Sequence, residues 1–303
     1  MAYLHENKEE FANAVNLASL KYHILPEVAE KDYYVTMILR ELSARLPFIV
    51  FKGGTSLSKC HKAIKRFSED IDLTIDTRIT EGQMKKLKKT IQSISETLGL
   101  SIPNIHETRS RRSYNRYIIQ YDSVMGGPEE SVSPSVLVET SFAEVSFPTE
   151  ILSVHSYIGD LMKTEAPGAL EDYFLDTFDM KVQSLDRTLA DKVFAICDYY
   201  LEDRTAKHSR HIYDIFKLLP LVPQTEQFRL LVKEVREERA KNNICPSAKP
   251  GVNVPALLSD IVVNQVYKSD YEMITSRLLE EDVSYPEAID AIRQIAATDM
   301  FSE

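Results

Sequence analysis

The chain has 303 residues, of which 44% are hydrophobic and 27% charged, and its formal net charge is −10. This length and composition exclude a disulfide mini-protein and a disordered chain, and they suit one large or two modest domains. Apolar stretches such as Phe48–Phe51 are far shorter than the roughly 20 residues of a membrane helix. The three cysteines are scattered, with no C-x-x-C spacing, so we expect a cytoplasmic protein that does not act in a membrane.

The charge is unevenly distributed along the chain. Residues 52–119 contain 14 Lys and Arg against 7 Asp and Glu, a net charge of +7, so the remainder carries −17. One interpretation is a solvated helix face followed by a basic loop. The other is a surface for a polyanion such as RNA. Both remain open at this point.

The first half of the chain alternates between helix and strand patterns. Residues 1–46 have apolar side chains at helical spacing, and Phe48–Phe51 has the short, apolar pattern of a buried strand. Gly53-Gly54 ends that strand, and Leu57, Cys60 and Ile64 then predict one face of a helix. Residues 70–76 alternate with a period of two, which predicts a second strand.

Further along, the pattern predicts a basic helix over 81–98, strands over 114–121 and 136–142, and a loop at 126–128. Beyond about residue 150 the pattern is mainly helical. We therefore expect an α+β fold. The predicted domains are a helical cap over 1–46, a core over 47–150 and a helical carboxyl-terminal lobe over 151–303.

The turn between the first strand and the first core helix is a candidate phosphate site. Gly53-Gly54 lets backbone amides approach an anion, and Ser56 follows with a hydroxyl donor. A simple structural turn remains the alternative, because Gly-Gly is common in turns. The candidate nucleotide-binding residues are Gly53, Gly54, Thr55, Ser56, Lys59 and Arg66. Arg66 could instead pair with Glu69.

Asp70 and Asp72 are candidate metal ligands. Residues i and i+2 of a strand face the same side, so the two carboxylates are expected to converge while Ile71 and Leu73 enter the core. Carboxylates of this kind suit Mg²⁺ bound with substrate phosphates. A two-metal arrangement needs a third acid, for which we choose Glu139, with Glu144 as its competitor. An exposed acidic strand is the simpler alternative.

Other candidates are less specific. Arg109, Arg111, Arg112 and Arg116, with Tyr114 and Tyr117 between them, suit either an RNA backbone with base stacking or a plain surface loop. Lys192 lies among apolar residues of a predicted helix, where it meets a phosphate or simply extends its amine to solvent. His208 and His211 with Asp214 have the helical spacing of a transition-metal site, which is the least favoured interpretation.

Two groups of motifs resemble the AbiEii/AbiGii-type abortive-infection nucleotidyltransferase toxins, including the MenT-type toxins. The first group is Lys52–Lys59 followed by Arg66–Leu73, and the second is Leu189–Ala195 followed by Arg210–Ile215. The resemblance implies a polymerase-β-like nucleotidyltransferase core with a helical lobe. It also implies that Gly54 and Ser56 hold the triphosphate, Asp70 and Asp72 hold Mg²⁺, Lys192 meets the nucleotide phosphates and Asp214 supports Lys192.

The resemblance further implies the toxin of a toxin–antitoxin system, with a cognate antitoxin as partner, and some members of the family modify tRNA 3′ ends. We therefore expect an Mg²⁺-dependent enzyme that transfers NMP from an NTP to an RNA acceptor, preferably a tRNA, with release of pyrophosphate. The catalytic candidates are Asp70, Asp72, Glu139, Lys192 and Asp214. Transfer to a protein hydroxyl and a non-catalytic NTP-binding module are the alternatives.

Overall fold

The structure is a computed structural model that describes residues 2–126 and 132–302. The chain forms two compact units, each assembled from separate segments. Unit 1 comprises Met1–Cys60, Glu69–Phe142 and Thr149–Val182. Unit 2 comprises His61–Ser68, Ala143–Pro148 and Gln183–Glu303. We describe each unit by itself.

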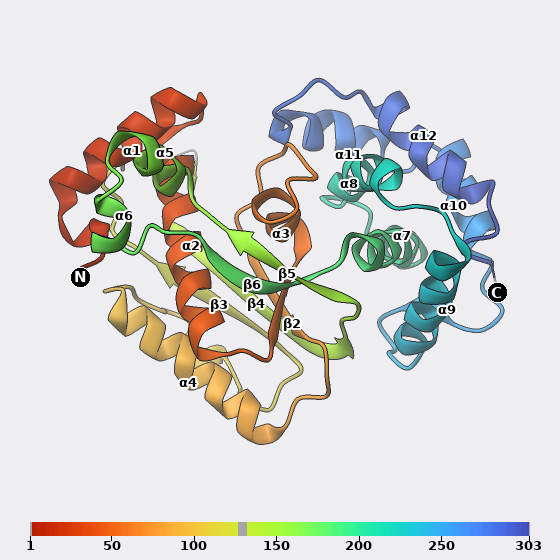
Figure 1. Cartoon of the computed structure of the whole chain (residues 1–303). Helices are drawn as coiled ribbons and strands as arrows, with labels where there is room; N and C mark the ends of the chain where they lie inside the picture. The colour runs from red at the N-terminus through yellow and green to blue at the C-terminus, as the bar shows by residue number, and fades with distance from the viewer. Residues whose placement is uncertain (1, 127–131, 303) are drawn as a thin grey trace. The chain divides into compact units, whose positions relative to one another are not determined.

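Unit 1 is built on a six-stranded sheet with the strand order β3-β4-β2-β1-β6-β5 (Figure 1). β1 pairs with β2 in antiparallel and with β6 in parallel orientation, and β3 pairs with β4 in antiparallel orientation, so the sheet is mixed. The strands are β1 Ile49–Lys52, β2 Ile71–Ile75, β3 Tyr114–Gln120, β4 Ser135–Val145, β5 Thr149–Val154 and β6 Phe178–Gln183.

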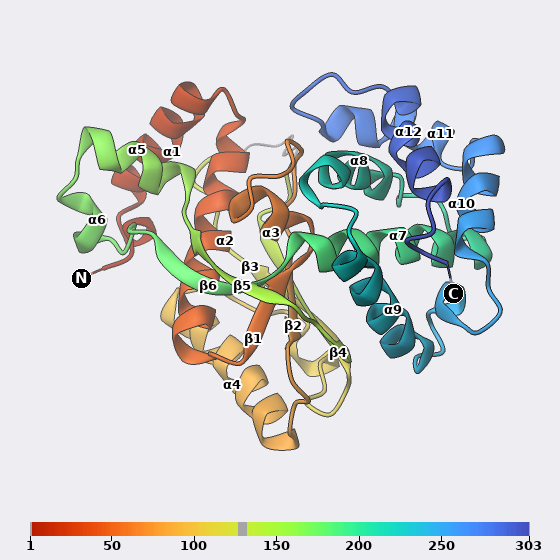
Figure 2. The ribbon, with the colours of Figure 1, turned by 45° about the vertical axis from the view of Figure 1, so that its right-hand side comes forward.

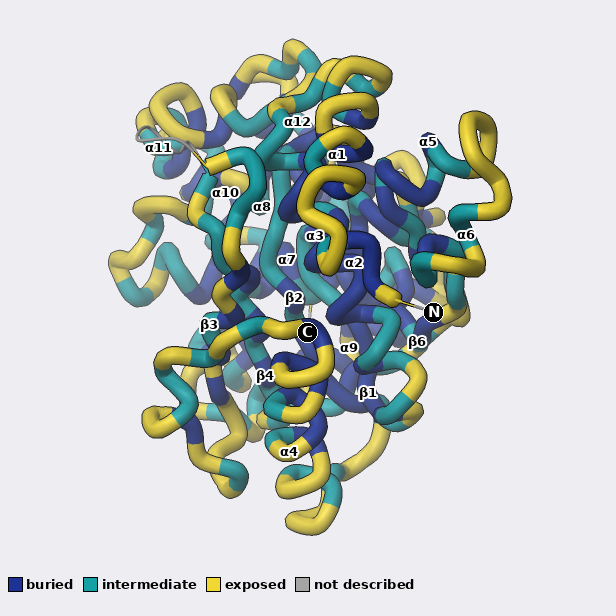
Figure 3. Tube along the Cα trace, turned by 90° about the vertical axis from the view of Figure 1, so that its left-hand side faces the viewer, coloured by how far each residue is buried: buried dark blue, intermediate teal, exposed yellow. Residues whose placement is uncertain are grey.

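One face of the sheet carries the apolar core of unit 1. Ile71, Leu73, Tyr117 and Val138 point to this face and join one core cluster with the apolar residues of α2 and α4. Most of α2 is buried (Figure 3). The helices of unit 1 are α1 Lys8–Tyr22, α2 Pro26–Arg45, α3 Gly53–Lys59, α4 Glu81–Thr97, α5 Tyr157–Glu165 and α6 Ala169–Asp172, with 3₁₀ turns at Leu4–Glu6 and Ile105–Glu107.

Unit 2 is a helical assembly in which α7 is almost completely buried on its apolar face and α12 packs against α8 and α10 (Figure 2). Its helices are α7 Leu185–Leu201, α8 Arg210–Leu218, α9 Glu226–Ala240, α10 Val254–Val263, α11 Lys268–Met273 and α12 Tyr285–Ala296. Three short 3₁₀ helices join them, η3 Leu219–Leu221, η4 Pro246–Ala248 and η5 Thr275–Leu278. Within residues 2–126 and 132–302, no helix combines the length and apolarity needed to cross a membrane.

The four predicted strands and the basic helix are confirmed by β1, β2, β3, β4 and α4. Two details were wrong. The helix after Gly53-Gly54 ends at Lys59, so Ile64 lies outside it, and Asp70 lies just before β2 rather than within it. In the predicted loop at 126–128, Gly127 and Pro128 lie outside the described residues.

The main omission was β5 and β6, because residues beyond 150 were expected to be mainly helical. β5, Thr-Glu-Ile-Leu-Ser-Val, lacks a regular alternation of apolar and polar residues, whereas β6, Phe-Asp-Met-Lys-Val-Gln, has one that the sequence analysis overlooked. β6 nevertheless pairs with β1, with Phe51 opposite Val182, and so extends the sheet past the strand that leads to the Gly-Gly turn. The division into a cap over 1–46, a core over 47–150 and a lobe over 151–303 stays a prediction.

Candidate functional site

The Gly-Gly turn of unit 1 lies directly against the acidic strand. Gly53 has φ +82°, a left-handed conformation that side chains disfavour. A Cβ added at Gly53 would lie 1.9 Å from Asp72 Oδ2 and 2.8 Å from Asp72 Cγ. In the ladder, Lys52 is paired with Asp72, which brings the end of β1 beside this carboxylate. Glycine at 53 therefore allows the turn backbone to touch the Asp72 side chain.

The side chains that follow the turn are packed inward. Thr55 and Ser56 are buried, and the Ser56 hydroxyl donates a 2.9 Å hydrogen bond to the Gly53 carbonyl oxygen. Lys59 is also buried and forms an ion pair with Asp32 of α2, whose second oxygen accepts a 3.0 Å hydrogen bond from the Tyr157 backbone amide. Of the predicted nucleotide contacts in this segment, Gly53 and Gly54 are the more exposed ones, and Thr55, Ser56 and Lys59 hold the turn from within.

The acidic segment is held in place on both sides of Asp70. Ile71 and Leu73 are fully buried, while Asp70 and Asp72 are partly exposed, as the alternation predicts for residues 71–73. Immediately before Asp70, Glu69 forms a 2.5 Å ion pair with Lys31 of α2. The buried Lys31 ammonium also donates a 3.2 Å hydrogen bond to the Ser133 carbonyl. The two partly exposed carboxylates thus extend from a rigid segment of backbone.

Glu139 lies on β4, the strand next to β2, opposite Arg116 of β3. Its Oε1 atom accepts a 2.9 Å hydrogen bond from the Tyr114 hydroxyl and lies 3.6 Å from Arg116 Nε. Burial, followed by the hydrogen bond and charge of Glu139 and the charge of Asp72, raises the pKa of Tyr114 to about 12, against the opposing charge of Arg116. The Tyr114 hydroxyl is therefore hydrogen-bonded to Glu139 and lies within the electrostatic influence of Asp72.

The competing acid, Glu144, belongs to unit 2. It pairs with Arg239 at 3.4 Å and accepts a hydrogen bond from the Cys245 thiol. Across the described residues, no three His, Cys, Asp or Glu side chains are gathered as a preformed metal-binding group. Asp70, Asp72 and Glu139 are accordingly separate carboxylates in this structure, and the candidate set His208, His211 and Asp214 does not form a cluster either.

In unit 2, Asp214 joins two of the residues predicted from the sequence. Its fully buried carboxylate accepts two hydrogen bonds from Arg66, 2.6 Å from Nε and 2.8 Å from a terminal nitrogen, and a third of 2.6 Å from Lys192 Nζ. Burial acts to raise the pKa of Asp214, but Arg66 and Lys192 hold it well below its usual range. The bidentate geometry identifies Asp214 as the anchor of both cations.

The lysine of this cluster responds differently. Burial lowers the pKa of Lys192 and the positive charge of Arg66 acts the same way, whereas Asp214 opposes them and raises it. The hydrogen-bond distances support an ion-paired cluster, so we regard Lys192 as the charged partner of Asp214. His211 lies three residues before Asp214 on α8, and burial, followed by the charge of Lys192, holds its pKa well below the usual range.

The arginines of the basic segment of unit 1 are all exposed. Arg109 and Arg112 also donate to backbone carbonyls, and Arg111 lies 3.7 Å from Glu81. Tyr117 is buried, whereas Tyr114 is exposed on β3 beside Arg116. On α4, exposed lysines line an open hollow of about 450 Å³, together with Arg45, Gly82, Thr90 and Ser93; these lysines are Lys85, Lys86 and Lys89.

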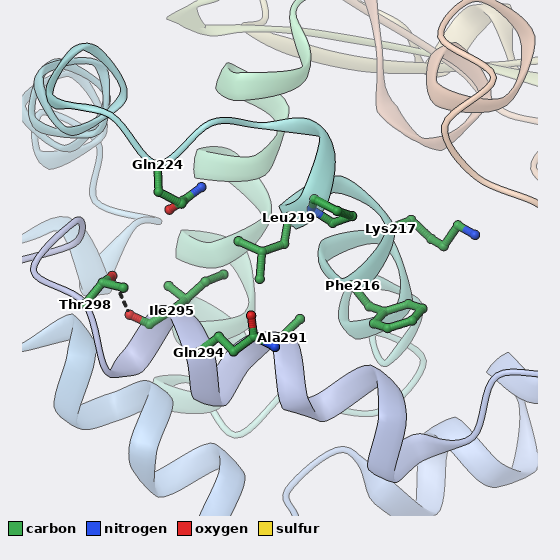
Figure 4. Close-up of a pocket in the computed structure, with 9 residues that line it drawn as sticks. Phe216, Lys217, Leu219, Gln224, Ala291, Gln294, Ile295 and Thr298 are labelled. Atoms are coloured by element: carbon green, nitrogen blue, oxygen red, sulfur yellow. Dashed lines mark hydrogen bonds between the residues drawn. The ribbon is translucent and has the colours of Figure 1, made fainter.

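A second pocket, of about 490 Å³, lies within unit 2 between α8, η3 and α12 (Figure 4). Its lining is mostly apolar and is formed by Phe216, Lys217, Leu219, Pro220, Gln224, Ala291, Gln294, Ile295 and Thr298. In Figure 4 the Thr298 hydroxyl donates to the Ile295 carbonyl at the edge of this pocket. None of the residues predicted to bind nucleotide, metal or acceptor lines it, and an apolar lining does not suit a triphosphate.

The sequence analysis missed Lys31 and Asp32, which hold Glu69 and Lys59. A signal was present, because Glu30, Lys31 and Asp32 are three consecutive charged residues that directly precede the apolar stretch Tyr33–Leu39 of the same helix. Charged residues in such a position need partners, since an unpaired buried charge is costly. Their partners lie far away in sequence and could not be named without the structure.

Comparisons with known proteins define the class of protein and then the family. The fold is similar to that of MenT4, a nucleotidyltransferase toxin from Mycobacterium tuberculosis H37Rv, with a TM-score of 0.52 and 17% sequence identity, covering 96% of this chain and 88% of that chain. The predicted α+β class is confirmed. A model of the family described as the nucleotidyl transferase AbiEii toxin of type IV toxin–antitoxin systems matches residues 38–296.

The chain therefore belongs to the AbiEii nucleotidyltransferase toxin family, as the motifs predicted. No curated protein matches it. Membership of this family makes the chain a nucleotidyltransferase with an NTP as substrate and the toxin of a toxin–antitoxin pair, with an antitoxin as partner.

Proposed function

We propose that this chain transfers NMP from an NTP to a hydroxyl of an RNA, with a tRNA 3′ end as the favoured acceptor, in an Mg²⁺-dependent reaction in the cytoplasm. Pyrophosphate is the second product. The transfer itself follows from the family. The observation that carries the proposal further is the contact between the Gly53 backbone and the Asp72 carboxylate, because it joins a candidate phosphate-binding turn to a candidate metal ligand.

The donor set of unit 1 fits Mg²⁺. Asp70 and Asp72 offer partly exposed carboxylate oxygens on a rigid backbone segment, and Mg²⁺ prefers one or two such ligands together with substrate phosphates. In the proposal Glu139 is the third carboxylate and uses Oε2, since Oε1 accepts from Tyr114. When bound, Mg²⁺ favours deprotonation of the acceptor hydroxyl and neutralises charge on the leaving pyrophosphate.

The remaining steps are assigned to the chain's own residues. The backbone amides of Gly53 and Gly54 bind the triphosphate, and Ser56 keeps the turn in its conformation through the hydrogen bond to the Gly53 carbonyl. Thr55 and Lys59 support the same turn from inside unit 1. In this proposal the Ser56 side chain holds the turn in place, and the turn backbone contacts the triphosphate.

Within unit 2, the proposal gives Lys192 the role of a positive charge for the nucleotide phosphates. Asp214 orients Lys192 through the 2.6 Å hydrogen bond, and Arg66 holds the other side of Asp214. Arg66, first considered as a nucleotide contact, is therefore proposed to act through Asp214, because its guanidinium group is buried and bound in bidentate fashion.

An RNA acceptor is favoured by the exposed cations of unit 1. Lys85, Lys86 and Lys89 lie together on α4, and the polyanion interpretation of the +7 segment requires such a group of accessible charges. The phosphates of an RNA backbone complement this surface better than the average protein surface does, so RNA is preferred over a protein hydroxyl.

The test is incubation of the full chain with Mg²⁺, each α-³²P-labelled NTP in turn, total RNA and lysate protein, followed by a denaturing gel. Asp70→Ala and Asp72→Asn are compared with wild type, and Asp172→Asn serves as the matched control because Asp172 is an exposed acid elsewhere in unit 1. We expect label in a tRNA-sized band that disappears in both site variants only. Label on protein would show that the acceptor is a protein and not an RNA. Full activity of Asp70→Ala would refute the assigned site.

A further inference from the structure

Tyr114 is unusual among the aromatic residues of this protein. Of the Phe and Tyr side chains in the described residues, it alone is exposed, with 49% of its surface accessible. Its neighbours Asn115 and Tyr117 are buried, as the alternation along β3 requires. A single exposed aromatic side chain is ordinary on a protein surface, so the exposure of Tyr114 matters only because of the residues that surround it.

The face that carries Tyr114 is the face of the candidate carboxylates. Tyr117 of β3, Val138 of β4 and both neighbours of Asp72 enter the core cluster on the other side of the sheet. Tyr114, Glu139 and Asp72 therefore share the face that points away from that core. The electrostatic influence of Asp72 on the Tyr114 hydroxyl agrees with this placement.

The ring of Tyr114 is fixed in position by its hydroxyl group. Tyr114 is paired across the strands with Ser141, yet its hydroxyl donates to Glu139, which lies opposite Arg116. The hydrogen bond to Glu139 therefore directs the ring from β3 toward β4, while 49% of the Tyr114 surface stays accessible. A flat ring held in this way is ready to stack, and little rotational freedom is lost on binding.

Arg116 completes the arrangement. Its side chain is 51% exposed, and its Nε atom lies 3.6 Å from the same Glu139 oxygen that accepts from Tyr114. Glu139 thus holds an aromatic ring and a guanidinium group side by side on one polar face. A planar π surface beside a cation is the combination that recognises a nucleotide, because the ring stacks on the base and the cation pairs with a phosphate.

We propose that Tyr114 and Arg116 form a nucleobase subsite on the Asp72 face of the sheet, in which a base stacks on the Tyr114 ring and Arg116 binds the adjoining phosphate. The base belongs either to the incoming NTP or to the acceptor end of the RNA, and both sources present the same chemistry. This inference rests on the proposed function, since it adds a base-binding surface to the site proposed there.

The experiment measures binding rather than turnover, in the full chain with Mg²⁺. The ligands are each labelled NTP, a set of short single-stranded RNA oligonucleotides, and inorganic tripolyphosphate, which has no base. The variants are Tyr114→Leu, which removes the ring, Tyr114→Gln, which removes it while keeping a polar surface, and Tyr114→Phe, which keeps it. Gln120→Ala is the control, because Gln120 is an exposed residue of the same strand.

We expect Tyr114→Leu and Tyr114→Gln to weaken binding of one base-containing ligand about tenfold, the usual scale for loss of one base–aromatic stack. Tyr114→Phe and Gln120→Ala should remain within about threefold of wild type, and tripolyphosphate should bind all variants equally. Weaker NTP binding would assign the subsite to the incoming nucleotide, and weaker RNA binding would assign it to the acceptor.

Several results would overturn the subsite. These are unchanged affinity for every NTP and RNA in both ring-deleted variants, an equal loss in Tyr114→Phe, a parallel loss for tripolyphosphate, or a wild-type chain that binds no base-containing ligand. Thermal unfolding of each variant separates a local effect from misfolding. Since binding needs no turnover, absence of label transfer would contradict the proposed function without deciding this subsite.

Discussion

Gly53 and Asp72 are in direct contact, because the backbone of Gly53 occupies the space next to Asp72 Oδ2 that any other residue would need for its Cβ. Two residues separated by a short helix and an excursion into unit 2 are thereby held together at the ends of β1 and β2. The relationship explains why the Gly-Gly turn and the acidic strand occur as a combination. A change at one partner necessarily affects the other.

Gly53→Ala should therefore do more damage than an ordinary glycine substitution. Position 53 has a left-handed φ, which costs a residue with a Cβ about 1–2 kcal/mol, and the clash with Asp72 adds to that cost. Gly99→Ala is the matched control, since Gly99 also has a positive φ, of +64°, but has nothing within 4 Å of the added Cβ. In urea unfolding, Gly53→Ala should lose more stability than Gly99→Ala. In the nucleotidyl-transfer assay, only Gly53→Ala should lose activity. Equal effects of the two substitutions would show that the contact with Asp72 is unimportant.

The Arg66–Asp214–Lys192 cluster predicts a specific response to acid. The folded-state pKa of Asp214 is depressed below the usual value of about 3.9, so its contribution to stability is fully present above that value and is lost as the pH falls toward the folded-state pKa. The free energy of unfolding should therefore decrease more steeply below about pH 4 in wild type than in Asp214→Asn, which has no group to protonate there.

At neutral pH, the same Asp214→Asn variant should be less stable than wild type. It leaves two buried cations without their counter-ion, a situation that typically costs about 3–5 kcal/mol. The double variant Asp214→Asn with Lys192→Met should recover part of this loss, because one of the two uncompensated charges is then removed. No recovery would indicate that Lys192 and Asp214 are energetically independent.

Lys31 is expected to act as a positioning residue for the acidic segment. Lys31→Met removes the buried ion pair to Glu69 and the hydrogen bond to Ser133, and it should raise the Mg²⁺ concentration needed for half-maximal transfer. The loss of stability should be about 1–3 kcal/mol, reduced from the value for a fully buried pair because Glu69 is 32% exposed. Adding Glu69→Gln should restore part of the stability and lower the Mg²⁺ requirement again. A normal Mg²⁺ dependence in the single variant would exclude the positioning role.

The α4 lysines are expected to supply binding energy for RNA that depends on salt. Reversing the charges of Lys85, Lys86 and Lys89 to Glu should weaken RNA binding and make the remaining binding less sensitive to salt, since fewer counter-ions are released. The control reverses three exposed lysines elsewhere, Lys8, Lys207 and Lys233, and produces the same change in net charge. Filter binding over a range of KCl concentrations gives, for each triple variant, the slope of the logarithm of the binding constant against the logarithm of the salt concentration. Similar slopes for the two triple variants would mean that overall charge, and not this surface, governs RNA binding.

The sequence by itself was sufficient for those features that depend on neighbouring residues. The helix and strand periods predicted β1 to β4 and α4, because backbone conformation and side-chain alternation are set over a few residues. The Gly-Gly and Asp-x-Asp motifs indicated the family through their resemblance to known members, and the same resemblance singled out Lys192 and Asp214.

The tertiary structure decided which of these side chains have partners. The sheet pairing of β3 with β4 brings Tyr114 to Glu139, and packing of unit 2 brings Arg66 to Asp214. β5 joins the sheet without a strand-like pattern of its own, and β6 has such a pattern but gives no sign of its pairing with β1. Such contacts join residues far apart in sequence, and no local pattern specifies the partner of a charged or aromatic side chain. That is why the sequence predicted the candidate catalytic groups, whereas their orientation and support emerged only from the folded chain.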